Sequence, residues 1–386
     1  MKAAKKSSGA AFLPTEIIAE VLKRLPVKYL IRFQCVCSLW KNLINSPSFI
    51  GSQVDHSNPE NLSLICRRNP YSATSTLDCL DRHMQLRQVE NNPFIDRLKS
   101  LEIVGSCNGL LCVQIRESGT LLSLYLWNPA TREVIQVPKS RTSMDLCYLC
   151  SLGFAFVNNY NIAIPYVTRS KMEYGIEVYS LATASWKKIQ MPWLQDGRFL
   201  TDSIIFNGSL FWLATKRGLT SHEEDCTNAI ASLHLAMDEF RLIPPPPLPM
   251  NEVDKLTVYE NRLAVFHYSH AFNAGNTSIN LWVIEEGIGG SWSKILTCGP
   301  YPYFGIPLAI WRNQIVCNVY PNCSVEPNDK NDAAGSYLFD PTSNEVKVLY
   351  SGRDGILHAV FTYAESLVPI SNIHTLKALI LKRNHC

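Results

Sequence analysis

The chain has 386 residues, of which 46% are hydrophobic and 10% aromatic, enough to bury the core of one large domain and a smaller one. Its formal net charge of +3 is small and its charges are scattered, which argues against a nucleic-acid-binding protein. No window approaches the roughly 18–20 consecutive apolar residues of a membrane helix, and no apolar signal peptide precedes Pro14. We therefore expect a protein of the cytoplasm or nucleus that makes no membrane contact.

The N-terminal region predicts a flexible terminus over residues 1–11 and helices over residues 12–50. In the first helix, apolar residues recur at positions 17, 18, 21, 22 and 25, which makes one apolar face. Pro14 suits the first helical position, and Pro26 ends the helix. The stretch from Val27 to Ile44 is again helical in pattern until Ser46-Pro47 stops it. These helices carry more apolar side chains than so small a unit can bury, so the surplus predicts a partner site.

After a linker over residues 51–60, the period changes to two, and residues 61–386 predict an all-β region. Two hairpin units interleave in it, and their copies start roughly 50 residues apart. One unit carries a two-residue turn that needs positive φ. Its copies lie at Asn108-Gly109, Asn207-Gly208, Glu260-Asn261 and Arg312-Asn313, with a weaker one near Asn158-Asn159.

Two hairpins per repeat predict the four-stranded blade of a kelch-like propeller, and the length of the region gives about six blades. The closing blade is predicted to join Leu62–Cys66 to the C-terminal Val360–Val368, because such closure removes free sheet edges. The run Pro244 to Pro247 is interpreted as a stiff connection between blades. The predicted fold class is therefore α+β and multidomain: a small three-helix unit followed by an all-β propeller.

The N-terminal segment Leu13-Pro-Thr-Glu-Ile-Ile-Ala-Glu-Val-Leu-Lys-Arg-Leu-Pro-Val-Lys-Tyr-Leu-Ile-Arg-Phe-Gln-Cys-Val-Cys-Ser-Leu-Trp40 resembles the F-box. It keeps Leu-Pro at both ends of the first helix, a Val-Lys-x-Leu centre and a Cys-Val-Cys-x-x-Trp finish. The remainder resembles the F-box-associated, kelch-like domain of the large plant F-box family, including the S-locus F-box group. The matching stretches are Ser106–Cys112, Leu126–Arg132, Phe206–Trp212 and Leu281–Ile284. The Gly-Gly doublets of well-formed kelch blades are absent except at Gly289-Gly290, which leaves the blade count open.

The resemblance implies a non-enzymatic substrate receptor of a Skp-cullin-F-box (SCF) ubiquitin ligase. The F-box would bind a Skp-type adaptor and, through it, cullin and RING subunits, while the β domain holds a protein to be ubiquitinated, whose identity the sequence does not give. The residues expected at the adaptor are Leu13, Pro14, Ile17, Val21, Leu25, Pro26, Val27, Leu30, Val36, Cys37 and Trp40. The sequence does not apportion them between contact with the partner and packing of the helices.

No residues predict a catalytic, metal or cofactor site. Cys147-x-x-Cys150 lacks a second ligand pair, and Glu223-Glu-Asp225 beside His222 is interpreted as a solvated loop. His234, His267 and His270 lack the spacing of a shared metal face. Two other functions stay open: an F-box scaffold that acts outside ubiquitin transfer, and a propeller enzyme with catalytic residues at its central channel.

Overall fold

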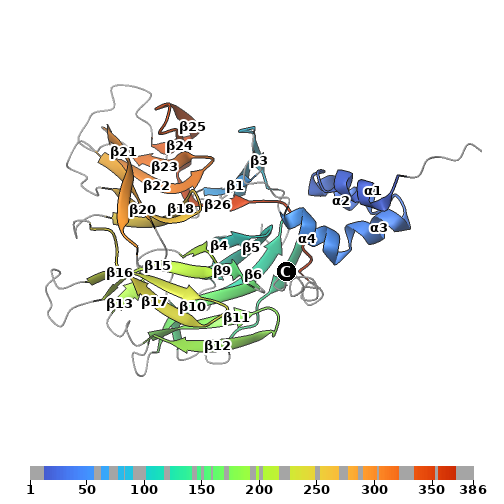
Figure 1. Ribbon diagram of the computed structural model, residues 1–386, viewed down its shortest axis with the longest axis horizontal. Coiled ribbons are helices and arrows are strands. Elements are labelled where there is room, and N and C mark those ends of the chain that lie inside the picture. The colour runs from blue at the N-terminus through green and yellow to red at the C-terminus, as the bar shows by residue number, and fades with distance from the viewer. Residues whose placement is uncertain are drawn as a thin grey trace, which may run out of the picture.

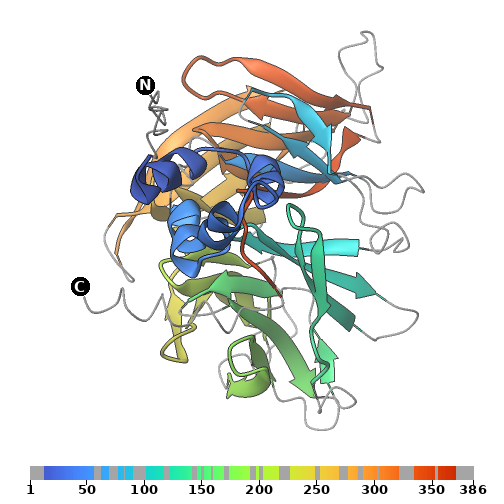
Figure 2. The ribbon, with the colours of Figure 1, turned by 90° about the vertical axis from the view of Figure 1, so that its right-hand side faces the viewer.

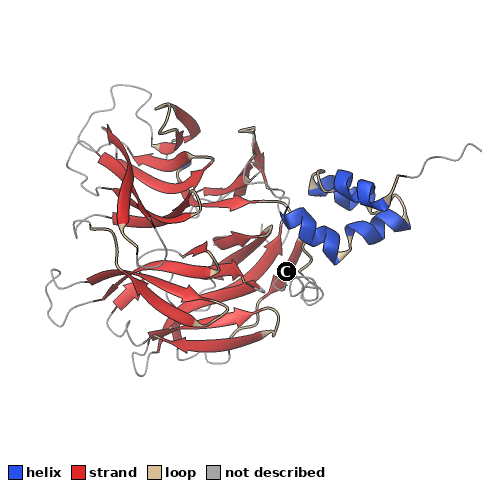
Figure 3. Ribbon diagram, viewed as in Figure 1, coloured by secondary structure: helices blue, strands red, loops and turns tan. Residues whose placement is uncertain are grey.

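The structure is a computed structural model of the chain, with helices at one end and strands forming the body (Figures 1 and 3). It describes residues 13–55, 62–68, 77–81, 83–89, 101–116, 122–140, 146–148, 152–157, 160–168, 174–191, 197–199, 203–216, 227–247, 253–268, 277–285, 290–301, 304–320, 334–352 and 355–370. None of the helices in these ranges is long and apolar enough to cross a membrane.

The helical unit contains α1 (Thr15–Leu22), α2 (Val27–Phe33), α3 (Ser38–Ile44) and α4 (Pro47–Asp55). The fourth helix corrects the prediction of three, because Pro47 begins a helix instead of stopping one. Proline fits the first helical position, where its missing N–H costs no hydrogen bond. The Ser46 hydroxyl caps the new helix by accepting from the Phe49 N–H at 3.3 Å. Helix α4 therefore occupies residues 51–55, which the sequence had suggested as linker.

The described strands form six sheets, each of four or five strands. Blade 1 consists of β26 (Leu357–Tyr363), β1 (Ser63–Arg68), β2 (Leu77–Leu80) and β3 (Leu86–Gln88). Blade 2 consists of β4 (Leu101–Cys107), β5 (Leu110–Arg116), β6 (Leu122–Asn128) and β7 (Glu133–Gln136). Blade 3 consists of β8 (Leu146–Tyr148), β9 (Gly153–Phe156), β10 (Tyr160–Thr168), β11 (Tyr174–Ser180) and β12 (Ser185–Gln190).

The other three blades follow the same antiparallel order. Blade 4 consists of β13 (Gly197–Phe199), β14 (Ile204–Phe206), β15 (Ser209–Lys216), β16 (Thr227–His234) and β17 (Glu239–Ile243). Blade 5 consists of β18 (Val253–Tyr259), β19 (Arg262–Tyr268), β20 (Thr277–Ile284) and β21 (Trp292–Tyr301). Blade 6 consists of β22 (Phe304–Trp311), β23 (Gln314–Tyr320), β24 (Gly335–Phe339) and β25 (Val346–Ser351).

The blades close into a ring. Each innermost strand contacts the next one around it, in the order β26, β4, β9, β14, β18, β22 and back to β26. The last strand pairs antiparallel with the first, from Ser63 opposite Tyr363 to Arg68 opposite Leu357. The predicted six-blade propeller and its closure by both ends of the β region are therefore confirmed. The closing C-terminal strand is Leu357–Tyr363, so residues 364–368 of the predicted segment are not strand.

The predicted tight turns are confirmed where the structure describes them. Asn108 and Gly109 have φ of 51° and 77°, and Asn207 and Gly208 have 45° and 72°. The turns Glu260-Asn261 and Arg312-Asn313 also have positive φ throughout. Asparagine and glycine tolerate this left-handed conformation better than other residues do. The weaker copy at residues 158–159 lies outside the described residues.

Candidate adaptor-binding surface

Helices α1, α2 and α3 each bury at least one large apolar side chain. Leu22, Val27, Leu30 and Ile44 are each at most 2% exposed. Phe33 and Trp40 pack edge to face, with ring centroids 5.3 Å apart, which joins α2 to α3. These contacts give the helices a small core of their own.

Other large apolar side chains of the same helices face outward. The exposed fraction is 62% for Leu13, 49% for Ile17, 52% for Val21 and 59% for Val36. Each of these four was expected at the adaptor from the sequence. A small domain that leaves this much apolar surface uncovered marks a protein-interaction site. We call the exposed apolar residues of helices α1 to α3 and their flanks the docking face.

The remaining residues expected at the adaptor lie in different surroundings. Pro14, Pro26 and Cys37 are exposed, Leu25 and Trp40 are partly buried, and Val27 and Leu30 lie inside. Cys37 caps α3, because its sulfur accepts from the Trp40 N–H at 3.5 Å. Val27 and Leu30 hold the helices together in this arrangement and do not reach the docking face.

The sequence reasoning left out three members of the docking face. Tyr29, Ile31 and Leu39 are 47%, 36% and 50% exposed. For Tyr29 and Ile31, the position beside the buried Val27 and Leu30 of the same helix was the available signal, because residues one or two away from a buried position point to another side of a helix. That signal required knowing which positions are buried.

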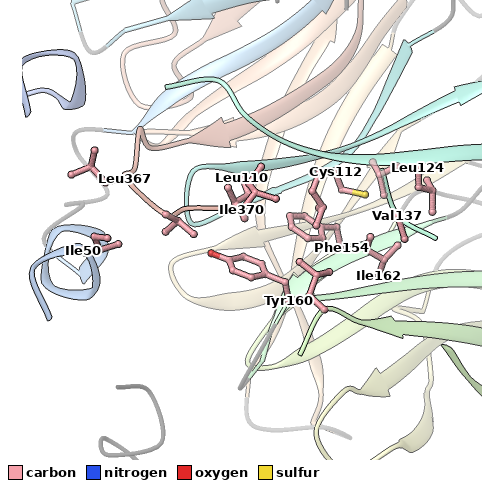
Figure 4. Packing of buried hydrophobic residues seen from close by; sticks show 14 of the residues in the cluster. Ile50, Leu110, Cys112, Leu124, Val137, Phe154, Tyr160, Ile162, Leu367 and Ile370 are labelled. Carbon is pink, nitrogen blue, oxygen red and sulfur yellow. The ribbon is translucent and has the colours of Figure 1, made fainter. Parts of the chain in front are cut away.

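The helices share a hydrophobic cluster with the propeller (Figure 4). Ile50 of α4 lies beside Leu367, and Ile370 lies between Leu110 and Tyr160. The helices therefore form one packed body with blades 2 and 3 and are not tethered by a loose connection.

The other candidates from the sequence give no reactive site among the described residues. Cys150, His222, Glu223, Asp225 and His270 lie outside the described residues, as does the side chain of Cys147. His234 accepts from the Met237 N–H at 3.3 Å within a turn, and His267 is 4% exposed. No three His, Cys, Asp or Glu side chains in the described ranges gather closely enough to hold a metal ion.

Burial keeps the propeller thiols in their protonated form. It raises the pKa of Cys66 and of Cys317 to about 12 and that of Cys107 to about 11. Because the thiolate is the nucleophile and the metal ligand, these cysteines are packing residues.

The comparisons with known proteins agree with this division of the chain. The F-box domain pattern matches residues 12–50, and the F-box associated beta propeller domain pattern matches residues 63–370. An F-box/kelch-repeat protein of Arabidopsis thaliana, At3g23880, is 27% identical over 325 residues, which cover 79% of this chain and 84% of that protein. The F-box protein At3g07870 of the same plant is 26% identical over 341 residues, covering 79% and 78%.

Among solved structures, TolB from Acinetobacter baumannii covers 78% of this chain and 66% of its own, at 10% identity and a TM-score of 0.46. A likeness of that size bears on neither activity nor partner. The domain matches, in contrast, span the helices and the whole ring. The chain therefore belongs to the family of F-box proteins that carry an F-box-associated β-propeller.

Proposed function

We propose that the chain is the substrate-recognition subunit of an SCF ubiquitin ligase. The F-box binds a Skp-type adaptor through the docking face, the adaptor links the chain to cullin and RING subunits, and the propeller holds the protein to be ubiquitinated. The chain itself is not catalytic in this proposal. Its contribution is proximity, since it raises the effective concentration of substrate lysines near the charged conjugating enzyme. We also propose that it works in the cytoplasm or nucleus.

The observation that carries the proposal is the docking face. Apolar residues from α1, the turn before α3 and α3 itself stay exposed on helices whose interior is already filled. In Figure 1, α4 lies between the propeller and the other helices, so α1, α2 and α3 extend from the body where a partner can reach them. An interface of this kind derives most of its affinity from a few large side chains at its centre.

The first experiment is affinity capture of the full chain from plant extract, with partners identified by mass spectrometry. A triple variant, Ile17→Asp, Val21→Asp and Val36→Asp, places charges on the docking face. The control is Val346→Asp with Val348→Asp, because these two valines of β25 are 56% and 62% exposed on the propeller. We expect the triple variant to lose adaptor and cullin, and the control to keep both.

Two outcomes would contradict the proposal. Capture of the adaptor by the triple variant would remove the docking face from the interaction, and absence of the adaptor from the wild-type capture would remove the ligase role. Adaptor capture without ubiquitin transfer to any propeller-bound protein would support the scaffold function instead.

A further inference from the structure

The chain continues past its last strand as a segment that touches both domains. We call residues 364–370 the strap. In Figure 2 it runs, in red, from β26 between the helices and the strands of blades 2 and 3. Ser366, Leu367, Val368 and Ile370 are each at most 6% exposed, although the segment belongs to neither helix nor strand.

Blade 2 holds one side of the strap with side-chain hydrogen bonds. The Asn128 amide donates to the carbonyl oxygens of Ser366 and Val368 at 3.1 and 2.9 Å. The Glu133 carboxylate accepts from the Ile370 N–H at 2.7 Å. The Ser366 hydroxyl in turn donates to the Asn108 carbonyl at 2.6 Å. Asn128 is fully buried, so these bonds form away from water, where loss of a donor is costly.

The F-box holds the other side. Gln53 of α4 donates its amide to the Glu365 carbonyl at 3.2 Å. Burial against the helices raises the pKa of the Glu365 carboxyl, while the nearby backbone N–H of Val27, the first residue of α2, and the charges of Arg87 and Lys28 oppose the rise. Leu367, Val368 and Ile370 also join the cluster that contains Leu22, Val27, Leu30, Ile44, Phe49 and Ile50.

We infer that the strap fixes the F-box in one orientation on the propeller, and that Asn128 and Gly109 are positioning residues for it. The consequence for ubiquitin transfer rests on the proposed function: the adaptor and the propeller-bound protein would stand at a set distance, which proximity catalysis requires.

A second copy of the same turn shows what is special about position 128. The Asn128 side-chain oxygen accepts from the N–H groups of Ala130 and Thr131 at 2.9 and 3.3 Å. In blade 6, Asp340 makes the same turn with Thr342 and Ser343 at 2.8 and 3.2 Å. An acceptor alone satisfies the turn, and aspartate supplies it. Position 128 must also donate to the strap, and only an amide does both.

Gly109 also differs from its counterpart in another blade because the strap crosses it, and here the difference is the space available for a side chain. A side-chain carbon placed on it would overlap the Ser366 hydroxyl and stand 2.7 Å from the Ala364 carbonyl oxygen. On Gly208, at the matching turn of blade 4, it would meet nothing closer than 3.7 Å. Both glycines have positive φ, of 77° and 72°, so alanine strains both backbones alike and crowds the strap only at position 109.

The test is hydrogen exchange of backbone amides, measured by mass spectrometry on the full chain bound to the adaptor. Asn128→Asp keeps the turn acceptor but turns a carboxylate toward two carbonyl oxygens. We expect amides of the strap and of α4 to exchange at least about tenfold faster than in wild type. The control Asp340→Asn should leave both segments unchanged, and both variants should still capture the adaptor.

Equal exchange in Asn128→Asp and Asp340→Asn would overturn the inference, as would faster exchange in the strap with α4 unchanged. If Asn128→Asp does not fold, Gly109→Ala and Gly208→Ala replace the pair. Faster exchange of the strap and α4 amides is then expected in Gly109→Ala only. Exchange is read on the chain itself, so it can also be measured without the adaptor. A wild-type chain that captures no adaptor would contradict the proposed function. The inference about the strap would still be tested by the exchange rates of the strap and α4 amides in the free chain.

Discussion

Trp186 of blade 3 donates its indole N–H to the carbonyl oxygen of Pro138, at the end of the outer strand of blade 2, at 2.8 Å. Trp292 of blade 5 repeats this contact on Pro244 of blade 4 at 2.9 Å. The same tryptophan-to-carbonyl hydrogen bond therefore joins the outer strands of two pairs of neighbouring blades, far from the contacts between the innermost strands. Pro244 opens the proline run that was interpreted as a connection, and its carbonyl gives that run a structural role.

Replacing Trp186 by phenylalanine keeps a ring and removes the donor. We expect a loss of about 1 kcal/mol in the free energy of unfolding, typical of one net hydrogen bond. Denaturant unfolding followed by circular dichroism measures it. Trp292→Phe removes the matching donor on blade 5 and should cost a similar amount. A Trp186→Phe protein as stable as wild type would show that the contact is energetically neutral.

Trp40 and Val21 separate packing from docking within the F-box. Trp40 is partly buried against Phe33, so Trp40→Ala should destabilise the helices by about 2 kcal/mol and speed amide exchange in α2 and α3. Val21 is 52% exposed, so Val21→Ala should leave exchange unchanged and weaken adaptor binding. Calorimetric titration with purified adaptor measures the affinity. An unchanged adaptor affinity in Val21→Ala, or faster amide exchange in that variant, would contradict this division.

His358 makes the stability of the closing blade dependent on pH. The side chain is exposed, but neighbouring atoms remove part of its hydration, and this desolvation and the nearby Arg67 lower its pKa below the ordinary value of 6.5, while Glu102 opposes the shift. A histidine whose pKa is lower in the folded state binds fewer protons there than in the unfolded chain. Stability is therefore complete above the ordinary pKa and is lost as pH falls through it.

We expect a lower melting temperature at about pH 5.5 than at about pH 7.5, and a smaller difference in His358→Gln, which cannot be protonated in this range. Differential scanning calorimetry at both pH values measures it. An equal pH dependence in wild type and variant would assign the effect to other groups.

Cysteine alkylation maps the docking face without any substitution. Cys35 and Cys37 are exposed, whereas Cys66, Cys112 and Cys317 are buried with raised pKa values. Iodoacetamide should modify the first two in the free chain and the last three only after unfolding. Binding of the adaptor should protect Cys37, which was expected at the interface. Mass spectrometry of tryptic peptides gives the extent at each site, and unprotected Cys37 in the complex would place it outside the interface.

The turns and the closure of the ring could be predicted because their sequence signals either lie within a few residues or recur along the chain. Asn108-Gly109 needs positive φ wherever it occurs between two strands, and the spacing of its copies gives the blade. Helix α4 was missed because Pro47 fits both the end of one helix and the start of another. The local signal for a start, Ser46 as N-cap before a proline at the first helical position, was interpreted as a stop. The F-box residues could not be divided into packing and exposed residues from the sequence, because Val27 and Val21 are both apolar at helical spacing and only the packing shows which one is covered.

The sequence did not separate the strap from the closing strand, because Val360–Val368 was predicted as one segment of that blade. Val368 belongs to no repeat, and its partner Asn128 lies 240 residues earlier in the chain. In the sequence, Asn128 stands out only as part of Leu126–Arg132, one of the stretches that resemble the F-box-associated domain. The difference between Asn128 and Asp340 carries information only once the strap is seen to cross one turn and not the other.

Pairing of β26 with β1 also sets an order of events during synthesis. The F-box helices are synthesised before the propeller, but the surface that they pack on includes residues 364–370, which follow every strand of the ring. Until then, the first blade lacks its inner strand, and β1 presents an open edge to other chains. If residues 364–370 fix the F-box as inferred above, the helices of an unfinished chain have no set orientation. Completion of the ring would then decide both whether the last sheet edge is covered and where the helices point.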